Sequence, residues 1–381
     1  MPIDGAATAT SGSPGTRLRA GFTGQVFALC LVIFIADIVA GIIIPTFSLF
    51  ARDVGVSLAV LGAVNTLGGA TQLVTSIPLG VVSDRFGRKR VVIGGLLAFA
   101  GTTVALTVAT GLPLIILGRV LQGIATVACF QIGAAYLGDV TEPGKRAVAF
   151  GWYTTAMGLG FTVGPLVGGV IADAFGARTS YGVAAGISVF GALVAQRMLV
   201  DPVRSVPNVA PPRWYRQIGL LLRRHELTLV ALGNLLVSFT FAGAVSTFFP
   251  LYAKNLDITQ ATIGTMFAVR AFVSAAGRIP NSIVTRAVGD QPVLLGALAL
   301  QTAVMFAIAS TSSVVWLTVL LAVEGLAFGA YLVAGQTWVA DRTEVENRGA
   351  AMGLYSATGS IGGIAAPLAL GLVAESWSVA T

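Results

Sequence analysis

The stretch GVVSDRFGRKR, residues 80–90, carries five charged residues in a chain of 381 residues of which only 10% are charged. It follows one long apolar run directly and precedes another. Charge gathered between two apolar segments is typical of a short loop at a membrane surface. We therefore interpret the stretch as a tight connection between two membrane-spanning helices. Its charged residues are Asp84, Arg85, Arg88, Lys89 and Arg90.

Long apolar runs dominate the rest of the chain, which is 55% hydrophobic. About 20 consecutive apolar residues cross a bilayer as a helix. Lipid cannot satisfy free backbone groups, so helices are expected, and the alternating short strands of a membrane barrel are not found. The sequence therefore predicts an all-α membrane protein with eleven spans, at residues 24–49, 57–82, 91–110, 114–137, 147–172, 180–200, 227–252, 260–285, 292–311, 314–338 and 349–373.

The basic residues lie mainly on one side of the predicted membrane. With a cytoplasmic N-terminus, 17 of the 23 Lys and Arg residues fall in cytoplasmic segments, three in external segments and three within spans. Because basic loops stay in the cytoplasm, we expect a multi-pass protein of the inner (plasma) membrane with its N-terminus inside. This distribution accounts for the net charge of +7, so no nucleic-acid partner is expected.

The sequence predicts neither a metal, a cofactor nor an enzyme. The single histidine, His225, lies in a loop, and Cys30 and Cys129 lie within spans, so a histidine-based metal site and a disulfide framework are not expected. No GxxxxGK[ST] phosphate-binding loop is found, which argues against ATP as the energy source. No nucleophile–base arrangement stands out either.

The two halves of the chain match at a fixed offset of 202 residues, which aligns Asp139 with Asp341 and Pro165 with Pro367. Such a repeat predicts two homologous helix bundles, a common transporter plan. The copy of the sixth span should begin near Thr381, so a twelfth span is missing and truncation is favoured over a natural variant. The expected organisation is a disordered tail at 1–23, a six-helix bundle at 24–200, a cytoplasmic linker at 201–226 and a second bundle at 227–381.

Three motifs resemble those of the major facilitator superfamily of transporters, and the resemblance covers residues 24–375. The charged loop resembles the motif between the second and third helices. GRVLQG, with Arg119 and Gln122, resembles the fourth-helix motif. GFTVGPLVGG resembles the fifth-helix motif, which is associated with proton-coupled antiporters, especially drug exporters. The resemblance implies a fold of two six-helix-type bundles, here without the twelfth helix. The matching fifth-helix residues are Gly160, Gly164, Pro165, Gly168 and Gly169.

The resemblance gives the charged loop a gating role. Asp84 is expected to face the N-terminus of the eleventh span near Asn347, where the helix dipole favours a carboxylate. Arg88 is expected to pair with Asp139 at the end of the fourth span. These contacts would lock the two bundles in the outward-facing state and break when the protein turns inward. The alternative is that the charges only fix topology. The other motif positions are Gly80, Arg85 and Gly87.

Asp37 lies near the middle of the first span. An ionisable group at that depth is costly and by default functional, and the surrounding stretch resembles the first helix of tetracycline and multidrug proton antiporters. We therefore predict that Asp37 carries the proton. Arg119 is expected to modulate it, with a structural ion pair between the two as an alternative. Gln122 lies on nearly the same helical face as Arg119.

Glu324 is the repeat equivalent of Gln122 and lies near mid-depth in the tenth span. It is a second candidate proton site or a cation-recognising carboxylate, with a hydrogen bond to a neighbouring helix as the alternative. Arg270, at similar depth in the eighth span, must pair with something. Its candidate partners are Glu324 and an anionic substrate, which keeps organic anions and zwitterions open.

The fifth-helix glycines recur every four residues and form one smooth stripe. Small residues allow close helix packing, and Pro165 bends its helix. A packing seam alone would explain this pattern, so the direction of transport enters only through the resemblance.

These features together predict a secondary active transporter that couples protons to the efflux of a small organic molecule or drug by alternating access. Its expected partners are that molecule, protons and the lipid bilayer, and a monomer is expected. The alternatives are a metabolite or sugar facilitator, an uptake symporter, and a non-transporting membrane protein.

Overall fold

The computed structural model describes residues 15–201, 224–344 and 348–378. These residues form helices and connecting turns, with no strand among them. The prediction of an all-α membrane protein is confirmed, because ten helices in the described ranges are long and apolar enough to cross a membrane.

The helices of the two halves follow one another with short connections. The first half contains α1 (Gly15–Asp53), α2 (Leu58–Phe86), α3 (Arg88–Val108), α4 (Leu112–Thr126), η1 (Val127–Gln131), α5 (Ile132–Val140), η2 (Pro143–Lys145), α6 (Arg146–Phe175) and α7 (Ala177–Met198). The second contains α9 (His225–Phe239), η3 (Thr240–Phe248), α10 (Phe249–Asn255), α11 (Gln260–Ala276), α12 (Arg278–Val288), α13 (Asp290–Ala309), α14 (Val314–Arg342) and α15 (Arg348–Ser378).

Two of the expected segments differ in the structure. Helix α1 already begins at Gly15, within the expected tail, whose first 14 residues lie outside the described ranges, as does most of the expected linker. The eighth expected span is divided at Gly277 into α11 and α12. Pro280 explains the division, because it has no N–H to donate to the carbonyl of Ala276 and its ring crowds that carbonyl. The count of eleven spans therefore stays a prediction.

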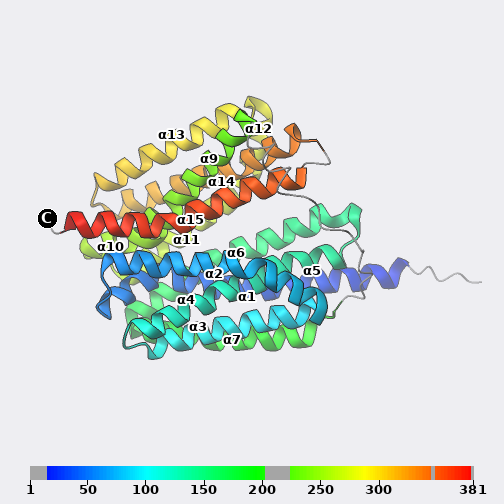
Figure 1. Ribbon diagram of the computed structural model, residues 1–381, viewed down its shortest axis with the longest axis horizontal. Helices are drawn as coiled ribbons and strands as arrows, with labels where there is room; N and C mark the ends of the chain where they lie inside the picture. The colour runs from blue at the N-terminus through cyan, green and yellow to red at the C-terminus, as the bar shows by residue number, and fades with distance from the viewer. Residues whose placement is uncertain (1–14, 202–223, 345–347, 379–381) are drawn as a thin grey trace, which may run out of the picture.

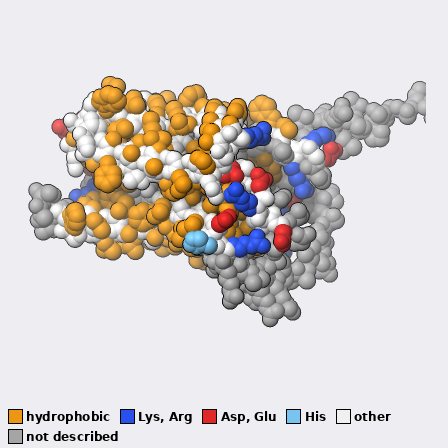
Figure 2. Space-filling model, turned by 90° about the horizontal axis from the view of Figure 1, so that it is seen from above, with side chains coloured by type: hydrophobic (Ala, Val, Ile, Leu, Met, Phe, Trp, Pro, Cys, Tyr) orange, Lys and Arg blue, Asp and Glu red, His pale blue; other side chains and the backbone are white. Residues whose placement is uncertain are grey.

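Apolar side chains fill the interior and also cover the outside. A cluster of buried apolar side chains runs through the first half from Val26 to Leu199, and a second lies within the second half. Large side chains such as Ile77 and Phe306 are exposed. On the face in Figure 2, hydrophobic side chains cover most of the described surface, and charges gather at one end beside the histidine. Such a surface suits lipid rather than water.

The two halves lie one above the other in Figure 1, and the second half diverges from the first toward the right, where α12 and the rising end of α13 lie. Two helix pairs join the halves: α6 packs against α11, and α2 packs against α15. The candidate site lies between and beside these two pairs.

Candidate functional site

Two equivalent helix crossings hold the halves together. A Cβ added to Gly264 of α11 would lie 3.0 Å from the Cα of Gly169 in α6, and it would also meet the carbonyl oxygen of Pro165. The backbones of α6 and α11 therefore approach as closely as glycine permits. The same contact recurs between α2 and α15, where each residue is 202 positions from its equivalent in α11 or α6. The equivalent residues there are Gly62, Pro367 and Gly371.

A carboxylate caps a helix N-terminus at each crossing. Asp173, near the end of α6, accepts a hydrogen bond from the backbone N–H of Gln260 at the start of α11, at 3.1 Å. Glu375, near the end of α15, accepts one from the N–H of Ala59 in the first turn of α2, also at 3.1 Å. The positive end of a helix favours such an anion. We call these contacts the paired caps and the end of the molecule that holds them the capped end.

The paired caps were not predicted from the sequence, although a signal was present. Asp173 and Glu375 are both acidic and are 202 residues apart. The repeat could therefore have pointed to them.

Removing the paired caps is expected to loosen the capped end. Loss of an N-terminal cap costs about 1 kcal/mol. Asp173→Ala and Glu375→Ala should each shift the equilibrium toward parted halves by about fivefold. The measurement is the distance distribution between spin labels at Ala63→Cys and Leu372→Cys, which are exposed positions on α2 and α15.

The spin-labelled protein would carry alanine in place of Cys30 and Cys129. Each single variant should give an intermediate population of long distances, and the double variant the largest. An unchanged distribution in the double variant would show that the glycine crossings alone keep this end closed.

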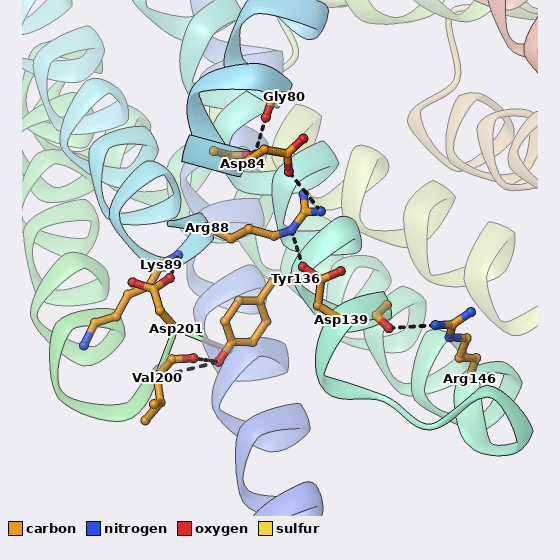
Figure 3. A network of polar contacts seen from close by, with 11 residues as sticks. Gly80, Asp84, Arg88, Lys89, Tyr136, Asp139, Arg146, Val200 and Asp201 are labelled. Carbon is orange, nitrogen blue, oxygen red and sulfur yellow. Dashed lines mark hydrogen bonds and ion pairs between the residues drawn. The ribbon is translucent and has the colours of Figure 1, made fainter. Parts of the chain in front are cut away.

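At the opposite end, the charged loop forms a network around Arg88 (Figure 3). The Arg88 guanidinium lies between Asp139, at 2.5 Å, and Asp84, at 3.3 Å. The expected pair between Arg88 and Asp139 is therefore present, but it joins two helices of the same half rather than the two bundles. The start of the eleventh span near Asn347, the expected partner of Asp84, lies outside the described residues.

The expected loop is a single residue in the structure: residues 80–86 belong to α2 and residues 88–90 to α3, and Gly87 joins the two helices with a φ of 97°. Side chains other than glycine rarely adopt this conformation. On the far side of the network, the backbone N–H of Lys89 donates to Asp201 at 2.9 Å. The carbonyl of Gly80 accepts a hydrogen bond from Ser83, while Arg85 is exposed.

The fifth-helix motif contacts two different helices. A Cβ on Gly160 would lie 2.8 Å from the Cβ of Asp37, so the glycine stripe packs directly against α1 at the predicted proton carrier. Gly169 and the carbonyl oxygen of Pro165 face α11 instead, while the ring of Pro165 packs against α1. The motif therefore joins Asp37 to the crossing between the halves. The other stripe residues, Gly164 and Gly168, meet Gly41 and Ile42.

Asp37 is buried, with 6% of its surface exposed, and its surroundings differ from the expectation. Arg119 does not pair with it. The Arg119 guanidinium lies over the ring of Phe47. Phe47 is ten residues beyond Asp37, which is a rise of about 15 Å along α1. Arg278, at the start of α12 in the other half, lines a cavity together with Gly158 and Thr162, which lie on either side of Gly160 on α6. The sequence places Asp37 and Arg119 within spans but does not show which parts of two helices meet.

Two cavities lie between the halves. One of about 550 Å³ separates α6 from α11 and α12, and Arg278 lines it. The other, of about 270 Å³, lies between α2, η1, η3 and α15. Its polar lining is uncharged and comes from Gln72, Ser76, Gln131 and Ser360. Gln131 ends a π-helical segment, a distortion that is frequent at functional sites.

The structure brings Arg119 and Gln122 together. The Arg119 guanidinium donates to Oε1 of Gln122 at 2.5 Å and to Oδ1 of Asn65, and its centre lies 3.4 Å from the centroid of the Phe47 ring. The amide of Asn65 then donates to the hydroxyl of Thr247 in η3, at 3.3 Å. This chain of contacts therefore crosses from the first half to the second.

Arg270 and Glu324 form an ion pair inside the second half. Nε of Arg270 lies 2.5 Å from Oε2 of Glu324, and the two side chains are 3% and 0% exposed. Gln301 donates to the other carboxylate oxygen at 3.1 Å. The guanidinium also lies over the rings of Phe241 and Phe328. Of the two partners considered for Arg270, the structure contains Glu324. Among the described residues, no group of three His, Cys, Asp or Glu side chains is placed to hold a metal.

Comparisons with known proteins agree with this arrangement. A family model, Major Facilitator Superfamily, matches residues 29–254 and 230–381. An uncharacterized MFS-type transporter of Methanocaldococcus jannaschii is 20% identical over 364 residues, which cover 93% of this chain and 92% of that protein. Multidrug resistance protein 2 of Bacillus subtilis is 28% identical over 300 residues, or 76% and 73% of the two chains.

A solved structure has the same fold. It is a bacterial homolog of the human lysosomal transporter Spinster, inward-facing and unoccupied, with a TM-score of 0.78 and 18% identity. The match covers 94% of this chain and 83% of that one.

Proposed function

Because the chain belongs to the major facilitator superfamily and is a multi-pass membrane transporter, we propose that it exports a small organic molecule in exchange for protons. Relatives named as multidrug resistance proteins support export. Most of the basic residues lie at the end of the molecule that holds the charged loop. This distribution supports an orientation with the charged loop and the N-terminus in the cytoplasm. The capped end then faces outward.

The environment of Asp37 carries the proposal. Its carboxyl is buried in the middle of α1 against the fifth-helix glycine stripe. Among the described residues it forms no ion pair of its own, and Arg278 of the other half lines a cavity beside the same stretch of α6. The free energy of protonating a carboxyl in this position depends on how the two halves are arranged relative to each other. Motion of the halves would therefore couple to protonation.

The two ends of the molecule support alternating access. At the capped end, glycine contacts and the paired caps close the halves against each other. Toward the other end, the cavity lined by Arg278 separates α6 from α11 and α12. A closed end opposite a cavity is what one state of such a cycle requires.

Asp139→Asn is expected to slow transport about fivefold while leaving the melting temperature nearly unchanged. The pair it removes is partly exposed, and such pairs contribute up to about 1 kcal/mol. Arg88 would then pair with Asp84 alone, which weakens the attraction of that carboxylate for a helix N-terminus in the other half. The measurement is the initial rate of substrate-driven proton release from liposomes, beside a melting curve in detergent.

Glu142→Gln is the matched control for this loop. It removes the exposed pair between Glu142 and Lys145 at the same end of the molecule, and the rate should stay unchanged. Equal rates for Asp139→Asn and Glu142→Gln would show that the network has no gating role.

The test of the proposed function uses the purified chain in liposomes that hold a pH indicator. Lipophilic cations, anions and zwitterions would be added in turn, each with and without an imposed pH gradient. Proton movement that requires both the protein and one class of compound is the expected result. Transport of a radiolabelled compound with no proton movement would make the chain a facilitator. Inward accumulation driven by protons would make it an uptake symporter.

A further inference from the structure

We propose that Arg119 binds an oxyanion group of the transported molecule, most simply a carboxylate, so that the substrates of this chain include organic anions or zwitterions. The proposal rests on the proposed transport function and names the substrate class of the same pathway. It is drawn from a difference between two guanidinium sites that the repeat places at equivalent positions in the two halves.

The two sites are built on equivalent helix crossings. A Cβ on Gly123 would lie 2.6 Å from the carbonyl oxygen of Gly68, and a Cβ on Gly325 would lie 2.5 Å from that of Arg270. Each of these second-half positions is 202 residues beyond its first-half equivalent. The crossing of α2 with α4 therefore matches that of α11 with α14.

A guanidinium sits at the same place in both crossings, although it comes from different helices. In the second half, Arg270 itself extends to Glu324. The equivalent of Arg270 in the first half is Gly68, which has no side chain. Arg119 of α4 borders the space that a side chain would fill there, because its Cδ would lie 3.7 Å from a Cβ at Gly68. Arg119 then donates to Gln122, the equivalent of Glu324. Both halves thus direct a guanidinium at one repeat position.

The two sites differ in charge. Glu324 neutralises Arg270, whereas the hydrogen-bond partners of Arg119 are the neutral amides of Gln122 and Asn65. Among the described residues, no carboxylate lies within ion-pair distance of Arg119. Each guanidinium has one buried nitrogen without a hydrogen-bond acceptor, Nε of Arg119 and Nη2 of Arg270, but only Arg270 has a carboxylate beside it. A cation within a span requires a counter-charge. The Nε of Arg119 remains available to bind one.

The two sites also differ in access. Arg270 is 3% exposed and enclosed within the second half, whereas Arg119 and both of its amide partners are only partly buried. Through Asn65 and Thr247, the Arg119 site reaches the other half. It therefore lies at the boundary that opens and closes during transport, while Arg270 does not. A guanidinium held flat on a ring presents its remaining N–H groups in the fixed geometry that matches an oxyanion.

The test measures binding rather than transport, so that its result is separate from that of the proton assay. Thermal stabilisation of the purified full chain would be titrated with three aromatic carboxylates: benzoate, 1-naphthoate and indole-3-acetate. Each is compared with its own uncharged amide, and sodium chloride and sodium phosphate are titrated separately. The expected result is that at least one carboxylate stabilises the parent chain at about a tenfold lower concentration than its amide, since hydrogen bonds to charged groups are strong.

Gln122→Glu is the decisive variant because it places a carboxylate where the second half has Glu324. It should fold as well as the parent and lose the preference for the carboxylate by about tenfold, because the guanidinium then has an internal partner. Arg119→Lys keeps the charge but not the planar, forked geometry of the guanidinium, so it should lose part of the preference for the carboxylate. Gln196→Glu adds the same carboxylate at an exposed position on α7 and should keep the full preference.

Three outcomes would overturn the proposal. The first is equal stabilisation by each carboxylate and its amide in the parent chain. The second is a carboxylate preference that survives Gln122→Glu. The third is stabilisation by chloride or phosphate alone, abolished by Gln122→Glu, which would make Arg119 the holder of a bound inorganic ion. If carboxylates bind as expected but no compound moves protons, the proton-coupled export fails and the anion site stands.

Discussion

Replacing Glu324 by glutamine is expected to destabilise the protein by about 3–5 kcal/mol, because breaking a buried ion pair leaves an uncompensated charge. Arg270 and Glu324 are both enclosed, and Gln301 holds the second carboxylate oxygen. The expected measurement is a marked fall in melting temperature in detergent, with a smaller amount of folded protein recovered from membranes.

A double variant separates the structural role of this pair from a role in transport. Arg270→Met with Glu324→Leu replaces the ions by apolar side chains of similar length, a change that is often neutral or stabilising. It should therefore recover most of the stability lost in Glu324→Gln. If the double variant is stable and transports normally, the pair is a structural element of the second half. If Glu324→Gln is as stable as the parent, Glu324 is not ionised in this state and remains a second proton site.

Asp37→Asn is expected to abolish substrate-driven proton release while leaving the fold intact. The substitution keeps the size of the side chain and removes its only ionisable proton, and burial of a neutral amide costs less than burial of a carboxylate. Proton release should fall to the level of protein-free liposomes. The melting temperature should stay the same or rise.

Asp53→Asn provides the matched control, since it makes the same chemical change at the exposed end of the same helix. Its proton release should equal that of the parent. Proton release that persists in Asp37→Asn would place the proton carrier elsewhere and remove the central support for antiport. Substrate flux that persists in that variant without proton movement would instead show that Asp37 couples the two.

The sequence was sufficient for the helical class, for the position of the turn between α2 and α3 and for the closeness of Arg88 and Asp139, although residues 80–90 are helical in the structure except at Gly87. Those features follow from hydropathy, from local charge and from a known motif. The partner of Asp37 was not predictable in the same way. Periodicity gives depth along one helix, but which charges of the other half lie near it depends on how α12 turns after Gly277 and on how the two halves meet.

The role of the fifth-helix glycines shows the same limit. The stripe was visible as a pattern of small residues, and close packing was expected from it. The pattern did not tell which helix it meets. In the structure one face of the motif meets α1 at Asp37 and the other meets α11 at Gly264, and that double contact links the proton carrier to the interface.

The two glycine crossings have a mechanical consequence. While the capped end is closed, the two equivalent crossings each join one half to the other, so in the proposed cycle a tilt of one half about them would move its far end. Along α6, the crossing near Pro165 lies 19 residues from the start of the helix at Arg146, a lever arm of about 30 Å. A tilt of only about 10° then moves the far end by about 5 Å. In the proposed cycle, a small tilt at the crossings would thereby open the far end by a distance comparable to the width of an organic molecule.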